Sequence, residues 1–513
     1  MTAGRVAIIG AGIGGLTAAL SLAARGFDVT VLEAAPAVGG KMREVTAAGR
    51  PMDAGPTVFT MRWVFEELFA ELGLDFGVTI GLEPASLLAR HAWVASAFLD
   101  LFVDMDRSAD AIGAFAGAEE ARRYRLFCAD ARAMYETLKG PFLSSSKPNP
   151  VSLVNRVGLS RLSALWRLKP FSTMAQALSQ QFTDPRLRQL YGRYATYCGS
   201  SPYEAPATLM LVAHVEQEGV WYVKGGMHQL ALGVAKAASR AGATIRTGEK
   251  VAEIIVGRTR TEGVRLASGE VIAADHVIVN ADASAVGSGL FGETASLAVG
   301  VVPAARRSLS AMVWTMVAEA SGFPLSRHNV FFSRDYRDEF DRLFSRRSLP
   351  DEPTVYICAQ DRGDDAPSDQ MGPERMLVLV NAPATGDTHS FSTEDIEPCQ
   401  DRMLAQLKRC GLTLKPITDG SVLTTPTDFA RLFPATGGAL YGRVSHGWTA
   451  TFQRPDGRTK IPGLYLAGGS VHPGPGVPMA ALSGRLAASA LLSDAGLIRS
   501  SHPVAMPGGM STR

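Results

Sequence analysis

The sequence predicts an α/β protein whose core is a parallel sheet that begins near the N-terminus. Arg5–Ile9 is a short apolar run of the kind that forms a buried parallel strand. The glycine-rich turn Gly10–Gly15 follows, and the Ala- and Leu-rich segment Leu16–Arg25 is typical of a helix that stops at Gly26. Asp28–Glu33 again reads as a strand. The chain therefore opens with a β-α-β unit.

Further elements are predicted along the chain. The stretch from Val64 to Leu138 has a mostly helical pattern. Later segments include predicted strands at Thr244–Arg246, Val251–Val256, His276–Asn280, Met376–Val380 and Gly463–Ala467, and predicted helices at Thr393–Cys410 and Met479–Ala490. The sheet is therefore expected to take strands from both ends of the chain.

The composition is typical of a large globular protein. Of 513 residues, 46% are hydrophobic and 19% are charged, which excludes a disordered or coiled-coil chain. With 51 Lys and Arg against 49 Asp and Glu, the net charge is +2, so we expect no nucleic-acid partner. Five cysteines are scattered without metal-ligand spacing, which predicts no metal site and a reducing, cytoplasmic compartment. The uncharged stretch Val6–Ala24 is glycine-rich and lacks the flanks of a signal peptide or membrane span.

Gly10, Gly12 and Gly15 have the spacing G-x-G-x-x-G between a strand and a helix. Glycines there permit a tight turn and close approach of the backbone to a pyrophosphate, and the bare N–H groups of the helix terminus attract anions. Glu33, at the end of the second strand, is placed to accept hydrogen bonds from a ribose diol. The combination predicts a dinucleotide site; the alternative is a glycine-rich turn that binds nothing.

The segment after Glu33 favours FAD over NAD. Gly39, Gly40 and Lys41 form a second glycine loop that ends in a cation, and Asp53–Thr57 follows it. This loop lets the backbone run over another part of the cofactor, with Lys41 near a phosphate or ribose, which a nicotinamide enzyme would not need. The alternatives are a solvated Lys41 and an Asp53 that only forms a turn.

Residues 137–183 are basic and apolar and contain no Asp or Glu. A helix is expected between Asn149-Pro150 and Pro170. Its predicted apolar face carries Val154, Val157, Leu162, Leu165 and Leu168, with Arg156 and Arg167 opposite. This composition is typical of an interfacial segment, so we expect peripheral attachment to a membrane. The alternative is that this face packs into the protein core.

The C-terminal stretch Gly463–Gly484 combines a strand, a glycine-rich turn with His472-Pro-Gly-Pro-Gly476, and a helix of small residues. Here the chain resembles the phytoene-desaturase-like carotenoid desaturases. The resemblance extends over nearly the whole chain, including the N-terminal glycines, Tyr203–Leu209, Gly225-Gly226 and Thr425-Pro426. The stretch Asp53–Phe69 is most similar to the 1-hydroxycarotenoid 3,4-desaturases, or methoxyneurosporene dehydrogenases, of purple photosynthetic bacteria.

The resemblance implies an FAD-binding Rossmann-like domain of the glutathione-reductase type, with an inserted substrate-binding α+β domain and a helical membrane-facing part. The FAD-binding domain is expected in three parts, residues 1–82, 223–294 and 437–492. Residues 83–222 would form the helical substrate- and membrane-facing region, residues 295–436 the substrate-binding α+β region, and residues 493–513 a flexible tail.

The resemblance also implies roles for particular residues. Gly10, Gly12 and Gly15 would hold the pyrophosphate, Glu33 the adenosine ribose, and Gly40 and Lys41 the ribose–phosphate side. Val251 would contact the adenine through its backbone, and the segment from Gly469 to Met479 would lie at the flavin end.

The implied activity is C3–C4 desaturation of an acyclic 1-hydroxycarotenoid: 1-hydroxyneurosporene, 1-hydroxylycopene or methoxyneurosporene. Hydride transfer from C4 to flavin would leave a cation spread over the polyene, so C3 would lose its proton to a weak base, and no catalytic triad is expected. His472 is the candidate for proton handling, with a structural hydrogen-bonding role as the alternative. Tyr191, Tyr194, Tyr197 and Tyr203 either line a polyene tunnel or pack in the core.

The expected partners are an acyclic carotenoid, the surface of the inner or intracytoplasmic membrane, and an electron acceptor, oxygen or a quinone. Three alternatives stay open. The first is a phytoene desaturase that produces neurosporene or lycopene, and the second is a flavin amine oxidase, which would usually carry a lysine and an aromatic pair around the flavin. The third is a non-catalytic isoprenoid carrier on the same fold, which need not hold flavin.

Overall fold

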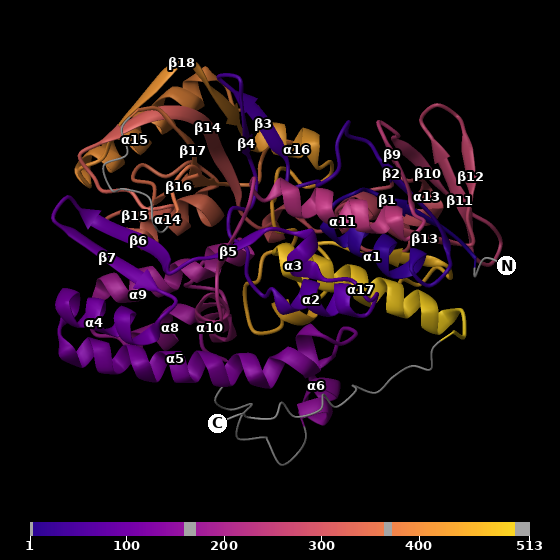
Figure 1. Cartoon of the computed structure of the whole chain (residues 1–513), viewed down its shortest axis with the longest axis horizontal. Helices are drawn as coiled ribbons and strands as arrows, with labels where there is room; N and C mark the ends of the chain where they lie inside the picture. The colour runs from indigo at the N-terminus through magenta and orange to yellow at the C-terminus, as the bar shows by residue number, and fades with distance from the viewer. Residues whose placement is uncertain (1–3, 158–170, 364–371, 498–513) are drawn as a thin grey trace.

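The computed structural model, which describes residues 4–157, 171–363 and 372–497, is built on two large sheets (Figure 1). The first sheet is parallel and has the order β19-β13-β1-β2-β9. Its strands are β1 (Arg5–Ile9), β2 (Asp28–Glu33), β9 (Thr244–Thr247), β13 (His276–Val279) and β19 (Leu464–Leu466). The strand order reverses beside β1, and in such sheets ligands bind at this switch point, outside the carboxyl ends of the strands.

Different elements pack against the two faces of the parallel sheet. Val6 and Ile8 of β1 pack in one core with three helices, whereas Ala7 and Ile9 pack in another core with a small antiparallel sheet. The helices are α1 (Ile13–Ala23), α11 (His228–Arg240) and α17 (Val477–Asp494), and the small sheet contains β10 (Val251–Val256), β11 (Thr261–Leu266) and β12 (Val271–Ala273). Burial on both faces explains why β1 is apolar throughout its buried residues.

The second sheet has seven strands in the order β18-β14-β17-β16-β15-β6-β7. Its strands are β6 (Leu87–Val94), β7 (Ala97–Phe102), β14 (Ser310–Ser321), β15 (His328–Phe331), β16 (Val355–Ala359), β17 (Glu374–Ala382) and β18 (Thr413–Thr424). Neighbouring strands are antiparallel except for β15 and β6, which run parallel.

Alternate residues of the seven-stranded sheet serve different purposes. Met312, Trp314 and Val378 pack in the core that also contains side chains of α15 (Thr393–Arg409). The intervening Val313 and Leu377 lie in a separate cluster on the other face and line a large cavity. Because side chains alternate along a strand, one set of strands supplies both a packed core and a cavity wall.

A helical region lies below the two sheets in Figure 1. It contains α4 (Met105–Ala116), α5 (Ala118–Leu138), α6 (Pro150–Val157), α8 (Met174–Gln181), α9 (Pro185–Gly192), the 3-10 helix η3 (Arg193–Cys198) and α10 (Leu211–Gln217). Phe127, Phe182 and Tyr191 pack against one another in its core. In the described part of the chain, no helix has both the length and the apolar character that a membrane crossing requires. The expected helix between residues 150 and 170 is present as α6, and its second half, with Leu162, Leu165, Arg167 and Leu168, lies outside the described residues.

The remaining α-helices and β-strands have at most eight residues each. They are β3 (Glu44–Ala47), β4 (Arg50–Asp53), β5 (Leu82–Pro84), β8 (Trp221–Val223), α2 (Trp63–Ala70), α3 (Phe76–Thr79), α12 (Ala283–Gly287), α13 (Glu293–Ser296), α14 (Tyr336–Asp341) and α16 (Pro426–Leu432).

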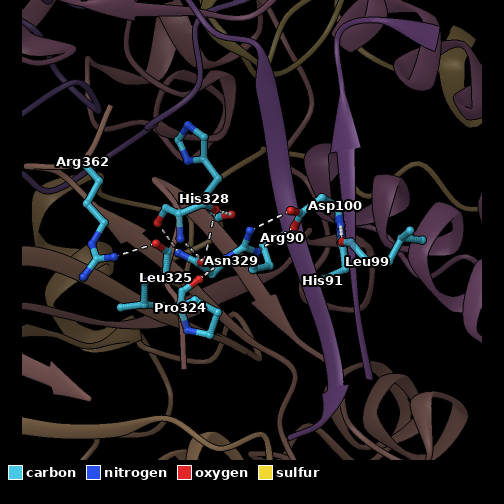
Figure 2. Close-up of polar contacts among 10 residues, drawn as sticks. Arg90, His91, Leu99, Asp100, Pro324, Leu325, His328, Asn329 and Arg362 are labelled. Carbon is cyan, nitrogen blue, oxygen red and sulfur yellow. Dashed lines mark hydrogen bonds and ion pairs between the residues drawn. The ribbon is translucent and has the colours of Figure 1, made fainter. Parts of the chain in front are cut away.

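The helical expectation for residues 64–138, and for the region 83–222, is wrong where β6 and β7 form a hairpin at the edge of the seven-stranded sheet. Arg90 of β6 donates two hydrogen bonds of 2.7 Å to Asp100 of β7 and another to the Pro324 carbonyl (Figure 2). Leu325, next to Pro324 in the connection between β14 and β15, accepts a hydrogen bond of 2.6 Å at its carbonyl from Arg362. Pairing with the distant strand β15 therefore decides the local structure over the helical pattern.

The crossing of α1 and α17 yields a stability prediction. A Cβ at Gly484 of α17 would lie 2.1 Å from the Gly14 carbonyl oxygen of α1, so Gly484→Ala must separate the two helices. We expect this variant to lose about 1–3 kcal/mol of unfolding free energy, measured by chemical denaturation. The control is Gly113→Ala in α4, whose added Cβ would meet Ala121 at 3.5 Å and should leave stability unchanged or raised by up to about 1 kcal/mol. Equal effects of the two substitutions would contradict the close crossing.

Candidate cofactor and substrate site

One cavity of about 1150 Å³ is lined by residues from both large sheets and from the helical region. At one end it reaches the carboxyl ends of β1, β2 and β13, where Gly10, Glu33 and Asn280 line it. This is the switch point of the parallel sheet, at which the sequence places the dinucleotide site. At the other end it reaches α6, α10 and the exposed rings of Phe171 and Trp448.

The N-terminus of α1 is open to an anionic ligand. The helix begins after Gly12, no side chain caps it, and its first turn has no acidic residue. Gly10, Gly12 and Gly14 line the cavity. Unpaired N–H groups and the positive end of the helix dipole at this point suit a pyrophosphate.

Close contacts explain why these positions are glycine. A Cβ at Gly12 would lie 2.7 Å from the Asn280 amide nitrogen, and a Cβ at Gly15 would lie 2.3 Å from the Gly10 carbonyl oxygen. Gly15 is not among the cavity-lining residues, so it closes the turn behind the site rather than facing a ligand. Sequence analysis does not single out Asn280, although its position at the end of a predicted core strand is an available signal.

Glu33 holds the glycine turn from the side. Its Oε2 accepts a hydrogen bond from the Ala11 N–H at 2.7 Å, and its Oε1 accepts one from the Ala35 N–H at 2.8 Å. Each carboxylate oxygen has a second lone pair available, and Glu33 lines the cavity together with Val251. The arrangement is consistent with Glu33 accepting from the adenosine ribose and with Val251 lying at the adenine end.

Lys41 is half-buried and hydrogen-bonded within the protein rather than freely solvated. Its Nζ donates to the Leu440 carbonyl at 2.5 Å and lies 5.2 Å from the centre of the Phe433 ring, and both Gly40 and Lys41 line the cavity. Burial lowers the pKa of Lys41; nearby Asp282 opposes this shift, and Arg454 adds a smaller lowering contribution. An anionic ligand group beside this ammonium would offset its desolvation, which fits the expected ribose–phosphate contact.

Asp53 has a structural role instead. Its carboxylate accepts hydrogen bonds from the N–H groups of Met227 at 2.6 Å and His228 at 3.0 Å, so it holds the N-terminus of α11. The alternative of a turn-forming Asp53 is thus closer to the structure than a direct ligand contact.

The segment before α17 is the one that the sequence resemblance assigns to the flavin end. Gly469 and Met479 line the cavity, and α17 begins after Gly476 without a side-chain cap. Arg454 lines the same end; it is buried and donates to the carbonyls of Tyr441, Gly469 and Arg443. It makes no ion pair within the described part of the chain. Sequence reasoning missed Arg454, which belongs to no motif.

His472 points away from this cavity. It is not among the lining residues, its side chain is buried, and its Nε2 lies 3.0 Å from the Phe142 carbonyl and 3.1 Å from the Ser145 carbonyl. Burial lowers the pKa of His472, which favours a neutral ring that donates from Nε2. This placement favours the structural alternative over proton handling.

The four candidate tunnel tyrosines divide between two roles. Tyr197 lines the cavity, whereas Tyr191 and Tyr194 pack in the helical core, and Tyr203 packs against Phe340.

The switch-point sheet, the open helix terminus and the glycine-lined cavity define a dinucleotide-binding α/β fold of the kind that serves FAD-dependent oxidoreductases. A solved oxidoreductase from Methanosarcina mazei has the same fold, with a TM-score of 0.59 and 15% identity over 94% of this chain and 99% of that chain. The model of the flavin containing amine oxidoreductase family matches residues 13–492, and the chain belongs to this family. FAD, predicted from the glycine loops, is thereby confirmed as the cofactor.

Two curated relatives are similar over nearly their full length. One is a hydroxyneurosporene desaturase from Rubrivivax gelatinosus, 52% identical over 99% of this chain and 97% of the relative. The other is a hydroxyneurosporene desaturase from Cereibacter sphaeroides, 43% identical over 96% of this chain and 98% of the relative. These relatives place the chain within the carotenoid desaturase family that the sequence motifs indicated.

The cofactor end can be tested with two variants. Glu33→Ala removes the acceptor expected to bind the ribose, and Gly12→Val fills the space before the glycine turn, so we expect both purified proteins to contain less than about a tenth of the normal FAD. The measurement is the flavin absorbance per protein. Glu270→Ala, which breaks only an exposed ion pair with Arg246, is the control and should keep its flavin. Normal flavin in both site variants would exclude these contacts.

Proposed function

We propose that the protein introduces the C3–C4 double bond of acyclic 1-hydroxycarotenoids such as 1-hydroxyneurosporene or 1-hydroxylycopene. The names of the two curated relatives support the substrate class. The observation that carries the proposal is the single cavity that joins the cofactor end to a long apolar section. A long, water-insoluble polyene needs a tunnel that buries most of its surface away from water.

The protein's part in this reaction is mainly to orient the chain and exclude water. Bound FAD supplies the hydride acceptor. Apolar side chains from both sides of the cavity, including Val212, Val313, Leu377 and Leu379, would hold the polyene in contact with the flavin end. Placing the reacting bond correctly and keeping water from a developing cation are contributions that need no catalytic triad.

This proposal makes a substrate prediction. The FAD-loaded protein should convert 1-hydroxyneurosporene and 1-hydroxylycopene to products with one more conjugated double bond, detected by chromatography and a red-shifted absorbance spectrum. Phytoene should remain unchanged, because it lacks both the hydroxyl and the conjugated chain end. Comparable conversion of phytoene to neurosporene or lycopene would show a phytoene desaturase instead.

We also propose that the cavity opens towards a membrane surface. Around its apolar end, Val151 is 70% exposed, Phe171 71% and Trp448 50%, and the rings of Phe171 and Trp448 make an edge contact with centroids 5.7 Å apart. Aromatic side chains of this kind insert at the headgroup level of a bilayer. A peripheral position would give access to an insoluble substrate and to an electron acceptor, oxygen or a membrane quinone.

Arg156 contributes less to this attachment than the sequence pattern suggests. Its guanidinium donates to the Ser146 carbonyl at 2.8 Å and to the Ser145 hydroxyl at 3.0 Å. Because these bonds hold it against its own loop, the exposed apolar side chains support the proposal more strongly than this arginine does.

Membrane attachment can be tested by liposome flotation. Phe171→Ser combined with Trp448→Ser should reduce the bound fraction at least about fivefold, because two exposed rings no longer enter the bilayer. The control is Val78→Ser combined with Leu297→Ser, two exposed apolar positions that do not line the cavity. If both double variants float like the unchanged protein, the membrane surface lies elsewhere.

A further inference from the structure

A small group of polar side chains interrupts the apolar section of the cavity. Arg193, Tyr197, Glu216 and Tyr356 all line it, between apolar residues such as Val212 and Leu379. Arg193 and Tyr197 belong to η3, Glu216 to α10, and Tyr356 to β16 of the seven-stranded sheet. Burying charged groups in an otherwise apolar wall is costly unless they have a function or full pairing.

Two hydrogen bonds hold the Glu216 side chain, and its carboxylate still has free acceptor sites. Its Oε2 accepts a hydrogen bond from the Tyr194 hydroxyl at 2.6 Å, and its Oε1 accepts one from the Tyr197 hydroxyl at 2.7 Å. The side chain is buried and makes no ion pair within the described residues. A carboxylate has about four acceptor sites, so it can accept another hydrogen bond from a ligand in the cavity.

The Arg193 guanidinium has N–H donors that no described residue engages. Of its five N–H donors, the described residues engage Nη1, which donates to the Tyr197 hydroxyl at 3.3 Å. Its guanidinium lies 5.3 Å from the ring centres of both Tyr197 and Tyr356, and no carboxylate within the described part of the chain forms an ion pair with it. The two rings fix the orientation of a permanent cation that still has donors available to the cavity.

The polar group is connected to the cofactor side of the cavity. The Tyr356 hydroxyl forms hydrogen bonds with the Thr57 hydroxyl at 2.6 Å and with His328 Nδ1 at 2.8 Å. Thr57 also lines the cavity. Two residues before it, Gly55 packs against Lys41, where a Cβ would lie 1.9 Å from the Lys41 carbonyl oxygen. Tyr356 therefore connects Arg193 to the segment Gly55–Thr57, and this segment packs on the glycine loop that ends in Lys41.

This position matches what the proposed reaction requires. The 1-hydroxyl oxygen is four bonds from C4, the carbon that must meet the flavin, so the groups that bind the hydroxyl must lie close to the flavin end. The rest of the substrate is a uniform hydrocarbon without another feature that could fix how far it enters the cavity.

We propose that Arg193 and Glu216 together bind the terminal hydroxyl of the substrate and thereby fix the position of the reacting bond. Arg193 donates a hydrogen bond to the oxygen of the substrate hydroxyl, and Glu216 accepts a hydrogen bond from the same hydroxyl. Tyr197 is hydrogen-bonded to both Arg193 and Glu216. The inference rests on the proposed function, and it makes these two residues determinants of specificity.

The arrangement also predicts how other chain ends are treated. A chain end without oxygen leaves the guanidinium and the carboxylate desolvated without new partners, which disfavours its binding. A 1-methoxy oxygen can accept from Arg193 but donates nothing to Glu216, so methoxy substrates should fall between the other two classes.

The test compares two substrates that differ only in the hydroxyl, 1-hydroxyneurosporene and 1,2-dihydroneurosporene, on the FAD-loaded full-length protein in liposomes. The readout is the ratio of kcat/KM for the hydroxylated substrate to that for the other. Arg193→Met and Glu216→Gln should each lower this ratio by about 10- to 100-fold, mainly through the hydroxylated substrate. Arg193→Lys, which keeps the charge with fewer donors, should lower it less.

Two tyrosine variants provide a matched comparison, with Tyr194→Phe as the control for Tyr197→Phe. Tyr197→Phe and Tyr194→Phe each remove one hydrogen bond to Glu216, but only Tyr197 lines the cavity and contacts Arg193. Tyr197→Phe should lower the ratio, and Tyr194→Phe should leave it within about threefold of the unchanged protein. A uniform loss for both substrates in all variants, at normal FAD content, would overturn the role in recognition.

Binding separates this inference from the proposed function. Affinity for each carotenoid can be measured without turnover from quenching of the protein's tryptophan fluorescence. If the unchanged protein converts neither substrate, the proposed function fails, while tighter binding of the hydroxylated chain that is lost in Arg193→Met still supports the hydroxyl site. Equal affinities for the two chains in the unchanged protein would overturn it.

Discussion

The backbone contact between α1 and α17 is the constraint on which the cofactor end of the molecule depends. A Cβ at Gly14 would lie 2.9 Å from the Ala480 carbonyl oxygen and 3.0 Å from the Gly468 nitrogen, and Gly484 approaches Gly14 just as closely from the other helix. Both helices start at uncapped ends beside the same cavity. Glycine at these crossings thus brings two positive helix ends to one cavity, and larger side chains would hold them apart.

The seven-stranded sheet forms one wall of the cavity. Its strands bury one set of side chains against α15 and present the alternate set to the cavity, so Tyr356 is anchored by a strand whose neighbours pack in a core. Glu216, which also lines the cavity, is held by two tyrosine hydroxyls. Polar groups fixed in this way can recognise one oxygen atom within a hydrocarbon without reorganising when the ligand arrives.

The parts of the fold predicted correctly from sequence are those whose signals are local. The first strand, the glycine turn, the first helix and Glu33 follow one another within the same β-α-β unit, and the structure brings them together as expected. The hairpin of β6 and β7 was missed because its place is set by parallel pairing of β6 with β15, far along the chain. A helical reading of residues 83–102 has no access to that partner.

The same distinction applies to the site. Gly12, Lys41, Gly469 and Met479 occur in recognisable motifs, and all line the cavity. Arg454 and Arg193 are single polar residues whose significance arises only when distant segments meet. His472 shows the opposite case, because it stands within a motif, yet its side chain turns to Phe142, which is 330 positions away in the sequence.

The topology of the parallel sheet has a consequence for how the protein is made. β1 lies between β2 and β13, and the outer strand β19 and the helix α17 come from the last described residues. During synthesis the glycine turn leaves the ribosome first, β13 follows more than 250 residues later, and α17 emerges about 200 residues after β13. Such non-local pairing delays folding. The nascent chain cannot complete this end of the cavity before α17 has been synthesised, so FAD can find all of these elements together only after that helix has left the ribosome.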